Sequence, residues 1–319
     1  MILAAIASSI TLLSVASDGT PFRLGSTDCR ISANGRWVAM NGHPASWPPG
    51  MSVRDLDAGT LAPVPFVPGV TGAELRAISS DGDAILYASA TTTTTTLYVY
   101  EQATGATDLI VYGGYASNLS PDGRYVLYST DPSGYGPTVM HDRVTGVDLQ
   151  IDQGGYHYDW PTISQDNRYV ALLGSFGPSL LDRSIGKTVP MDTTWLERVW
   201  FVPTISGNGR YLAYAVGDAA DPRYTRIIDR STGNVKNIFG LYAFGFRFTH
   251  DGRYLLWNTD YGPWYLYDRD SPGGGGATDL HAAYGIGPSA NVTISDDGSK
   301  IAFTGDQSQF MRGTYLLTR

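Results

Sequence analysis

The stretch Leu119-Ser-Pro-Asp-Gly-Arg-Tyr-Val-Leu-Tyr128 decides how this chain folds. Its Asp122-Gly123 pair predicts a tight turn, because glycine adopts a positive φ at no steric cost and aspartate tolerates it. The residues after the turn alternate aromatic or β-branched side chains with others, which is typical of a pleated strand. The stretch therefore predicts a strand end, a turn and a second strand.

The same pattern occurs seven times along the chain. The expected turn positions are Gly35, Gly82, Gly123, Asn167, Gly209, Gly252 and Gly298. They are separated by steps of 41 to 47 residues, and a period of about 40–45 residues with four short strands is typical of a β-propeller blade. We predict an all-β fold in which residues 1–319 form a single seven-bladed β-propeller with four-stranded antiparallel blades, named a to d in chain order.

A second recurrent phrase marks the end of strand c. It reads Asp-Arg-x-x-Gly at residues 142–146, 182–186 and 229–233, with looser forms in other repeats. Its final residues predict the turn between strands c and d. The arginines directly after the a–b turns (Arg124, Arg168, Arg210 and Arg253) belong to this repeat pattern, so we expect them to be structural.

The last repeat lacks a strand d, because the chain stops after one more strand at 313–318. Residues 10–15 (Ile-Thr-Leu-Leu-Ser-Val) precede the first strand a and have no blade of their own. We expect them to close the ring beside the C-terminal strand, which removes an exposed sheet edge. Residues 1–17 are also apolar enough for an export signal, but they have no positive n-region.

The composition limits the partners. The net charge of −8 and the pI near 5.0 argue against nucleic acid or an anionic membrane as the main partner. Cys29 is the one cysteine, so the chain has no internal disulfide and no thiolate metal cluster. There is no helical stripe and no stretch that predicts a membrane span. We expect a monomer without cofactor or metal.

The Ser-Pro-Asp-Gly-Arg-Tyr and Asp-Arg-x-Thr-Gly phrases resemble the TolB-type, WD40-like (PD40) propeller repeat, and the resemblance covers nearly all of the chain. It implies the propeller fold and, since such repeats are common outside the cytoplasm of bacteria, an extracytoplasmic (periplasmic or secreted) location. It does not imply one activity, because related propellers are binding scaffolds, gating domains of peptidases, or lyases. The chain contains no Gly-x-Ser-x-Gly nucleophile elbow.

The a–b and c–d turns are short and uniform, whereas the b–c and d–a connections vary from blade to blade. Variable loops on a rigid scaffold usually carry function, so we place the ligand site at the channel mouth on the variable face. Aromatic rings, which stack on sugars or apolar ligands, are frequent there. The candidate ligand-binding residues are Tyr115, Tyr156, His157, Tyr158, Asp159, Trp160, Trp195, Arg198, Trp200, Tyr261, Trp264 and Tyr284.

Acidic residues also recur on this side, at Asp131, Asp218, Asp260 and Asp306. If they converge, the mouth favours cations, but the simpler interpretation is that each aspartate caps a turn of its loop. The histidines show no paired spacing for zinc, and no linear calcium loop is present. His157 is the best candidate for a general base.

Three functions remain open. The first is a non-catalytic module that binds a glycan or a peptide at the aromatic, acidic mouth, which the many aromatic residues and the lack of a recognisable triad favour. The second is a scaffold for a protein partner. The third is an enzyme, specifically a polysaccharide lyase for uronate-containing glycans, with His157 or Tyr158 as the base and Arg198 neutralising the uronate carboxylate.

Overall fold

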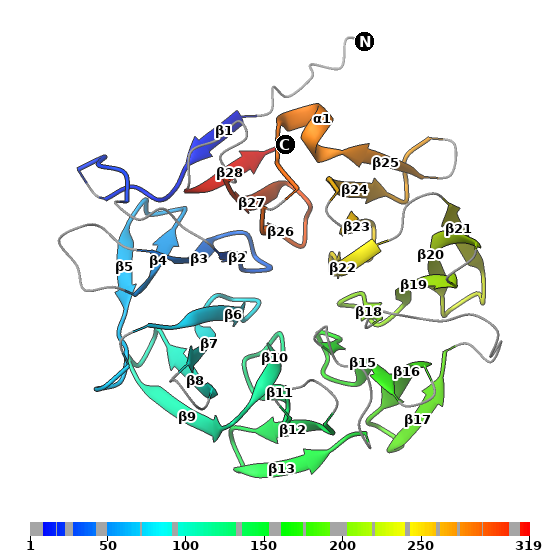
Figure 1. Cartoon of the computed structure of the whole chain (residues 1–319), viewed down its shortest axis with the longest axis horizontal. Helices are drawn as coiled ribbons and strands as arrows, with labels where there is room; N and C mark the ends of the chain where they lie inside the picture. The colour runs from blue at the N-terminus through cyan, green and yellow to red at the C-terminus, as the bar shows by residue number, and fades with distance from the viewer. Residues whose placement is uncertain are drawn as a thin grey trace.

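The computed structural model describes most of the chain. The described residues are 9–16, 18–22, 28–42, 50–70, 72–90, 95–131, 136–152, 161–174, 177–191, 203–218, 221–239, 243–259, 262–272, 275–288, 290–305 and 313–319. They form seven four-stranded antiparallel sheets arranged as a ring around a central axis (Figure 1). The predicted all-β, seven-bladed propeller is therefore confirmed.

Four blades come from the first part of the chain. Blade 1 contains β2 (Cys29–Ile31), β3 (Trp37–Asn41), β4 (Met51–Asp55) and β5 (Leu61–Val64). Blade 2 contains β6 (Glu74–Ile78), β7 (Ala84–Ala90), β8 (Thr95–Glu101) and β9 (Thr107–Tyr112). Blade 3 contains β10 (Tyr115–Leu119), β11 (Tyr125–Ser129), β12 (Thr138–Asp142) and β13 (Val147–Gln150). Blade 4 contains β14 (Thr162–Ile163), β15 (Tyr169–Gly174), β16 (Gly177–Asp182) and β17 (Lys187–Pro190).

The remaining blades complete the ring. Blade 5 contains β18 (Thr204–Ile205), β19 (Tyr211–Asp218), β20 (Asp221–Asp229) and β21 (Val235–Phe239). Blade 6 contains β22 (Ala243–Phe248), β23 (Tyr254–Thr259), β24 (Trp264–Asp268) and β25 (Gly276–Asp279). Blade 7 contains β26 (Val292–Ile294), β27 (Lys300–Thr304), β28 (Thr314–Thr318) and β1 (Ser9–Leu12). In each blade the strand named first lies innermost (Figure 1).

The N-terminal strand closes the ring, as expected. β1 pairs antiparallel with β28, with Ser9 opposite Thr318 and Leu12 opposite Tyr315. The two ends of the sequence therefore meet in one sheet (Figure 1). The amide of Leu13 continues the contact by donating to the carbonyl of Thr314 at 2.7 Å.

The hydrophobic core lies between neighbouring blades. For example, Ala213 and Ile227 of blade 5 pack with Leu255, Trp257 and Tyr267 of blade 6. Trp257 is fully buried, and burying one side chain of this kind contributes about 1.5–3 kcal/mol. The alternation of each strand sends every second residue into such a layer, so each blade is stabilised chiefly by its neighbours.

One short helix, α1 (Leu280–Tyr284), follows β25, where the sequence indicated no helix. The Asp279 carboxylate caps it by accepting from the amides of His281 and Ala282, and Gly285 ends it in the left-handed conformation. A helix of five residues is too short to show a periodic apolar stripe, so pattern analysis could not find it. No helix in the part of the chain described above has the length and apolar character needed to cross a membrane.

In five of the seven blades an arginine follows the a–b turn and pairs with the aspartate that ends strand c of the same blade. Arg124 makes a two-pronged contact with Asp142 at 2.9 and 2.7 Å. Its guanidinium also lies over the ring of Tyr125, with Arg183 of the next blade over the same ring at 4.2 Å. The same arrangement recurs at Arg168–Asp182, Arg210–Asp229 and Arg253–Asp268. These arginines are structural, as predicted.

Candidate functional site in the central channel

The twelve candidate residues from the sequence are only partly described. Tyr115 begins β10 and is partly buried. Trp264 begins β24, is buried, and donates its indole N–H to the carbonyl of Ala290 at 2.8 Å. Tyr284 ends α1 and packs beside the core cluster of blades 6 and 7. The other nine lie outside the described residues: Tyr156, His157, Tyr158, Asp159, Trp160, Trp195, Arg198, Trp200 and Tyr261.

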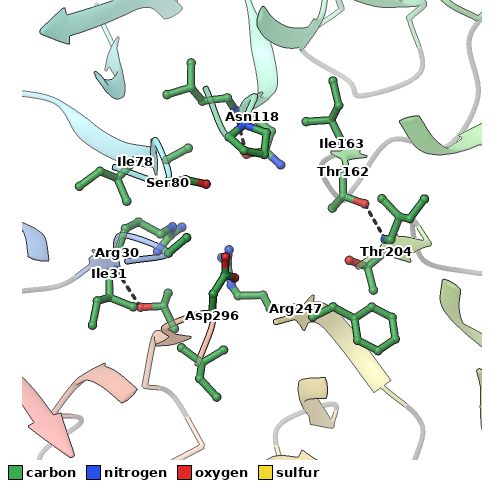
Figure 2. A pocket seen from close by; sticks show the side chains of 18 of the residues that line it. Arg30, Ile31, Ile78, Ser80, Asn118, Thr162, Ile163, Thr204, Arg247 and Asp296 are labelled. Carbon is green, nitrogen blue, oxygen red and sulfur yellow. Dashed lines mark hydrogen bonds between the residues drawn. The ribbon is translucent and has the colours of Figure 1, made fainter. Parts of the chain in front are cut away.

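A cavity of about 200 Å³ lies on the axis of the ring. It is lined by the innermost strands of all seven blades, and Figure 2 shows their side chains surrounding an open centre. None of Tyr115, Trp264 and Tyr284 lines it. The candidate site that the structure supports is therefore this cavity.

Two positions of the repeat line the cavity in every blade, and one of them is the apolar residue at the end of strand a, such as Ile31 or Ile163. Each strand a ends just before a serine or threonine of the repeat, such as Ser32, and the residue two positions earlier lines the cavity in every blade. We call these seven residues the channel ring: Arg30, Ala77, Asn118, Thr162, Thr204, Arg247 and Thr293. Five of them are labelled in Figure 2. Six of the seven side chains are polar or charged, so the ring provides hydrogen-bonding groups from several directions.

Several ring residues also link one blade to the next. The hydroxyl of Thr162 accepts from the amide of Ile205 at 3.1 Å, and that of Thr293 accepts from the amide of Ile31 at 3.1 Å. The side-chain amide of Asn118 donates to the carbonyl of Pro161 at 2.9 Å. These bonds hold the ring in place, so the cavity is pre-formed.

The two arginines of the ring differ in their surroundings. Arg30 is buried and donates to the carbonyl of Cys29 at 2.8 Å, to the side chain of Asn291 at 2.7 Å, and to Asp28. Burial raises the pKa of the Asp28 carboxyl, and the Arg30 guanidinium opposes this shift. The Arg30 guanidinium thus already donates hydrogen bonds to several groups of the protein.

Arg247, on β22, is half-buried and makes no hydrogen bond or ion pair with the described part of the chain. Burial and then the nearby Arg30 guanidinium lower the pKa of Arg247 to about 9, while Asp28 raises it. The side chain therefore keeps its charge at neutral pH. Figure 2 shows it extending from the wall toward the centre of the cavity.

The end of the cavity at the a–b turns has the opposite charge. We call this side of the ring the turn face, and the side where the innermost strands begin the loop face. Asp296, in the a–b turn of blade 7, lines the cavity there, and burial raises its pKa whereas His250 lowers it. The carboxylates of the other a–b turns, such as those of Asp81 and Asp122, cap their own turns and do not line the cavity. Asp296 is thus the carboxylate that the described cavity wall provides beside its two guanidinium groups.

No metal centre is evident in the described ranges, which contain no group of three or more His, Cys, Asp or Glu side chains able to hold an ion. His141, on β12, contacts Asp148 at 2.8 Å on the outside of blade 3. His250 belongs to the a–b turn of blade 6, where its carbonyl accepts from the amide of Asn208 at 2.8 Å. Neither histidine lines the cavity.

Comparison with solved structures places this architecture among known proteins. An oligogalacturonate lyase from Vibrio parahaemolyticus superposes with a TM-score of 0.66 at 14% identity, over 98% of this chain and 97% of the lyase. TolB from Acinetobacter baumannii gives 0.51 at 17% identity, over 84% of this chain. The chain has a TolB-like seven-bladed propeller fold.

This fold recurs in proteins with different roles. An oligogalacturonate lyase in complex with manganese gives a TM-score of 0.64 at 14% identity, over 99% of this chain and 94% of the lyase. Hydrazine synthase from Kuenenia stuttgartiensis gives 0.58 at 14% identity, over 100% of this chain and 99% of that one. The chain spans 59% of the length of the A. baumannii TolB. The sequence matches no protein-family model and no curated protein.

The side-chain types of the channel ring could have been read from the sequence, although not which of them meet in one cavity. Side chains alternate between the two faces of strand a, so the residue directly before the repeat serine faces the interblade core. The residue two positions before the serine lies on the opposite face. Reading that position through the seven repeats yields two arginines among small or polar residues. Our sequence analysis considered only the variable connections, and therefore missed Arg30 and Arg247.

Proposed function

We propose that this protein is a non-catalytic binding propeller that takes a glycan or a peptide into its central channel. The observation that carries this proposal is the channel ring, because it places polar side chains from six of the seven blades around one pre-formed cavity. Such convergence of polar groups in a concave site is typical of ligand binding. The aromatic residues of the variable connections would extend the site beyond the ring.

An extracytoplasmic location is part of this proposal, and it rests on the TolB-like character of the repeats. A protein scaffold is the second candidate, since the rim differs from blade to blade. The structural similarity to oligogalacturonate lyases supports the lyase alternative, but at 14% identity this similarity concerns the fold alone. The described residues do not supply a donor set for manganese, so we derive no metal-dependent step.

A variant with a blocked channel tests whether the ligand binds there. Thr204→Trp places a large ring in the channel at a position whose own side chain makes none of the interblade bonds described above. Thr188→Trp, on the exposed outer strand β17 of the neighbouring blade, is the matched control. We expect wild type and Thr188→Trp to bind the same members of a glycan and peptide panel in calorimetry, and Thr204→Trp to lose binding by about tenfold or more. Melting curves check that both variants fold.

Equal binding by Thr204→Trp would show that the ligand does not enter the channel. The same panel should include polyuronates, with ultraviolet absorbance followed over time. An unsaturated product that increases with protein concentration would replace the binding module with the lyase.

A further inference from the structure

The cavity contains one charged group that the described protein leaves without a hydrogen bond. The Arg247 guanidinium has five N–H donors in a planar fork, and it faces the cavity without a hydrogen bond to any described residue. The side chain is half-buried, and a charge-assisted hydrogen bond formed in such a partly desolvated site is stronger than one in bulk water. A ligand that supplies an acceptor at this point would therefore gain a strong hydrogen bond.

The charges around Arg247 specify what kind of acceptor fits. Arg30 is paired with Asp28, and Arg76 with Glu74 at 2.8 Å. Arg247 is then left as one uncompensated positive charge at the level of the ring. Asp296 is in the cavity wall at the turn face, and no ion pair joins these two described residues.

We infer that Arg247 binds a carboxylate of the channel ligand. A carboxylate matches the fork of a guanidinium with two parallel hydrogen bonds. Its single negative charge balances the single excess positive charge, whereas a phosphate monoester would bring a second charge that nothing in the ring neutralises. This inference rests on the proposed function and names the chemistry of its ligand.

Matched pairs of small ligands test the inference. Galacturonate is compared with galactose, and N-acetylaspartate amide with N-acetylasparagine amide, so that each pair differs in the carboxylate and not in size. Calorimetry on the full chain should show at least one acid binding about tenfold or more tighter than its neutral partner. The pair that responds identifies the source of the carboxylate as sugar or peptide.

Variants of Arg247 then locate the contact. Arg247→Gln should weaken binding of the responding acid by about tenfold or more, and Arg247→Lys should retain part of the affinity because it keeps the charge but not the fork. Arg226→Gln removes one positive charge on β20, away from the cavity, where Arg226 bonds Asn237 and Tyr224. It should bind the acid as wild type does.

Several results would overturn the inference. These are equal affinity for acid and neutral partners, an unchanged affinity in Arg247→Gln, or inorganic phosphate binding as tightly as the carboxylate. If neutral ligands bind and Thr204→Trp blocks them, the proposed function stands and only the role of Arg247 fails. If no acid binds at all, the inference fails, and the glycan and peptide panel decides the proposed function separately.

Discussion

At the scale of single residues, the seven a–b turns depend on positive φ. Six of the predicted positions are glycines with φ between 69° and 90°, and the seventh, Asn167, has φ of 57°. Glycine has a second reason to be present in four of these turns, because each packs against an aromatic ring of the preceding blade: Gly82, Gly209, Gly252 and Gly298. A Cβ on Gly252 would lie 2.3 Å from the Tyr211 ring. Backbone conformation and close packing thus select the same residue.

A comparison of Gly252 with Gly233 separates the effect of backbone strain from the effect of close packing. Gly252 and Gly233 have φ of 70° and 73°, but nothing lies within 4 Å of a Cβ on Gly233. We expect Gly233→Ala to lower the free energy of unfolding by about 1 kcal/mol, from backbone strain alone. Gly252→Ala should lower it by about 2–4 kcal/mol, since a clash with Tyr211 is added. Denaturant unfolding measures both, and equal losses would contradict the role assigned to the contact.

The arginine–aspartate pairs predict how stability depends on pH. The Arg36 side chain, which donates to Asp55, lowers the pKa of that carboxyl to about 2. Because this value is below the ordinary one near 3.9, the pair stabilises the fold fully above about pH 4. The contribution is lost as the pH falls through about 2.

Asp55→Asn should therefore lower the melting temperature most near neutral pH, and the difference from wild type should shrink below about pH 4. Circular dichroism melts across this range measure it. Asp57→Asn is the control, since its carboxylate is exposed and lies 3.8 Å from Arg36. A difference between Asp55→Asn and wild type that stays constant down to about pH 2 would contradict this assignment.

At the scale of elements, β1 is the closing strand of the ring. It pairs with β28, and Leu13 after it is buried against blade 1. Arg54, on β4 of blade 1, also donates from its Nε to the carbonyl of Leu13 at 2.9 Å. The segment is therefore held both by the last blade and by the first.

Removing this strand should open the ring. Deletion of residues 1–17 leaves the edge of β28 unpaired, and such edges promote aggregation. We expect the melting temperature to fall by about 10 °C or more, with a broadened transition. Deletion of residues 1–8, which leaves β1 in place, is the control. Calorimetry and light scattering check both, and an unchanged transition in the longer deletion would contradict closure by β1.

At the scale of the whole molecule, the ring gives the protein two unlike ends. The turn face repeats one short turn seven times, and Asp296 of blade 7 lines the cavity there. The loop face begins the innermost strands and leads to the guanidinium groups of the channel ring. The experiments on Arg247 and Thr204 therefore complement each other. The Arg247 variants test whether the charge of the channel binds a ligand carboxylate, and Thr204→Trp tests whether the ligand enters the channel.

The local features of this protein were determined by the sequence alone. The number of blades, the turn glycines, the structural role of the arginines after the turns and the closing strand all follow from short motifs and their spacing. Each of these features depends on contacts within a repeat or with its neighbour. The aromatic mouth remains a prediction, since most of its residues lie outside the described part of the chain. Only the tertiary structure decided that Arg30 and Arg247 share one cavity. They are five blades apart in the sequence, and it is closure of the ring around an axis that brings their side chains together.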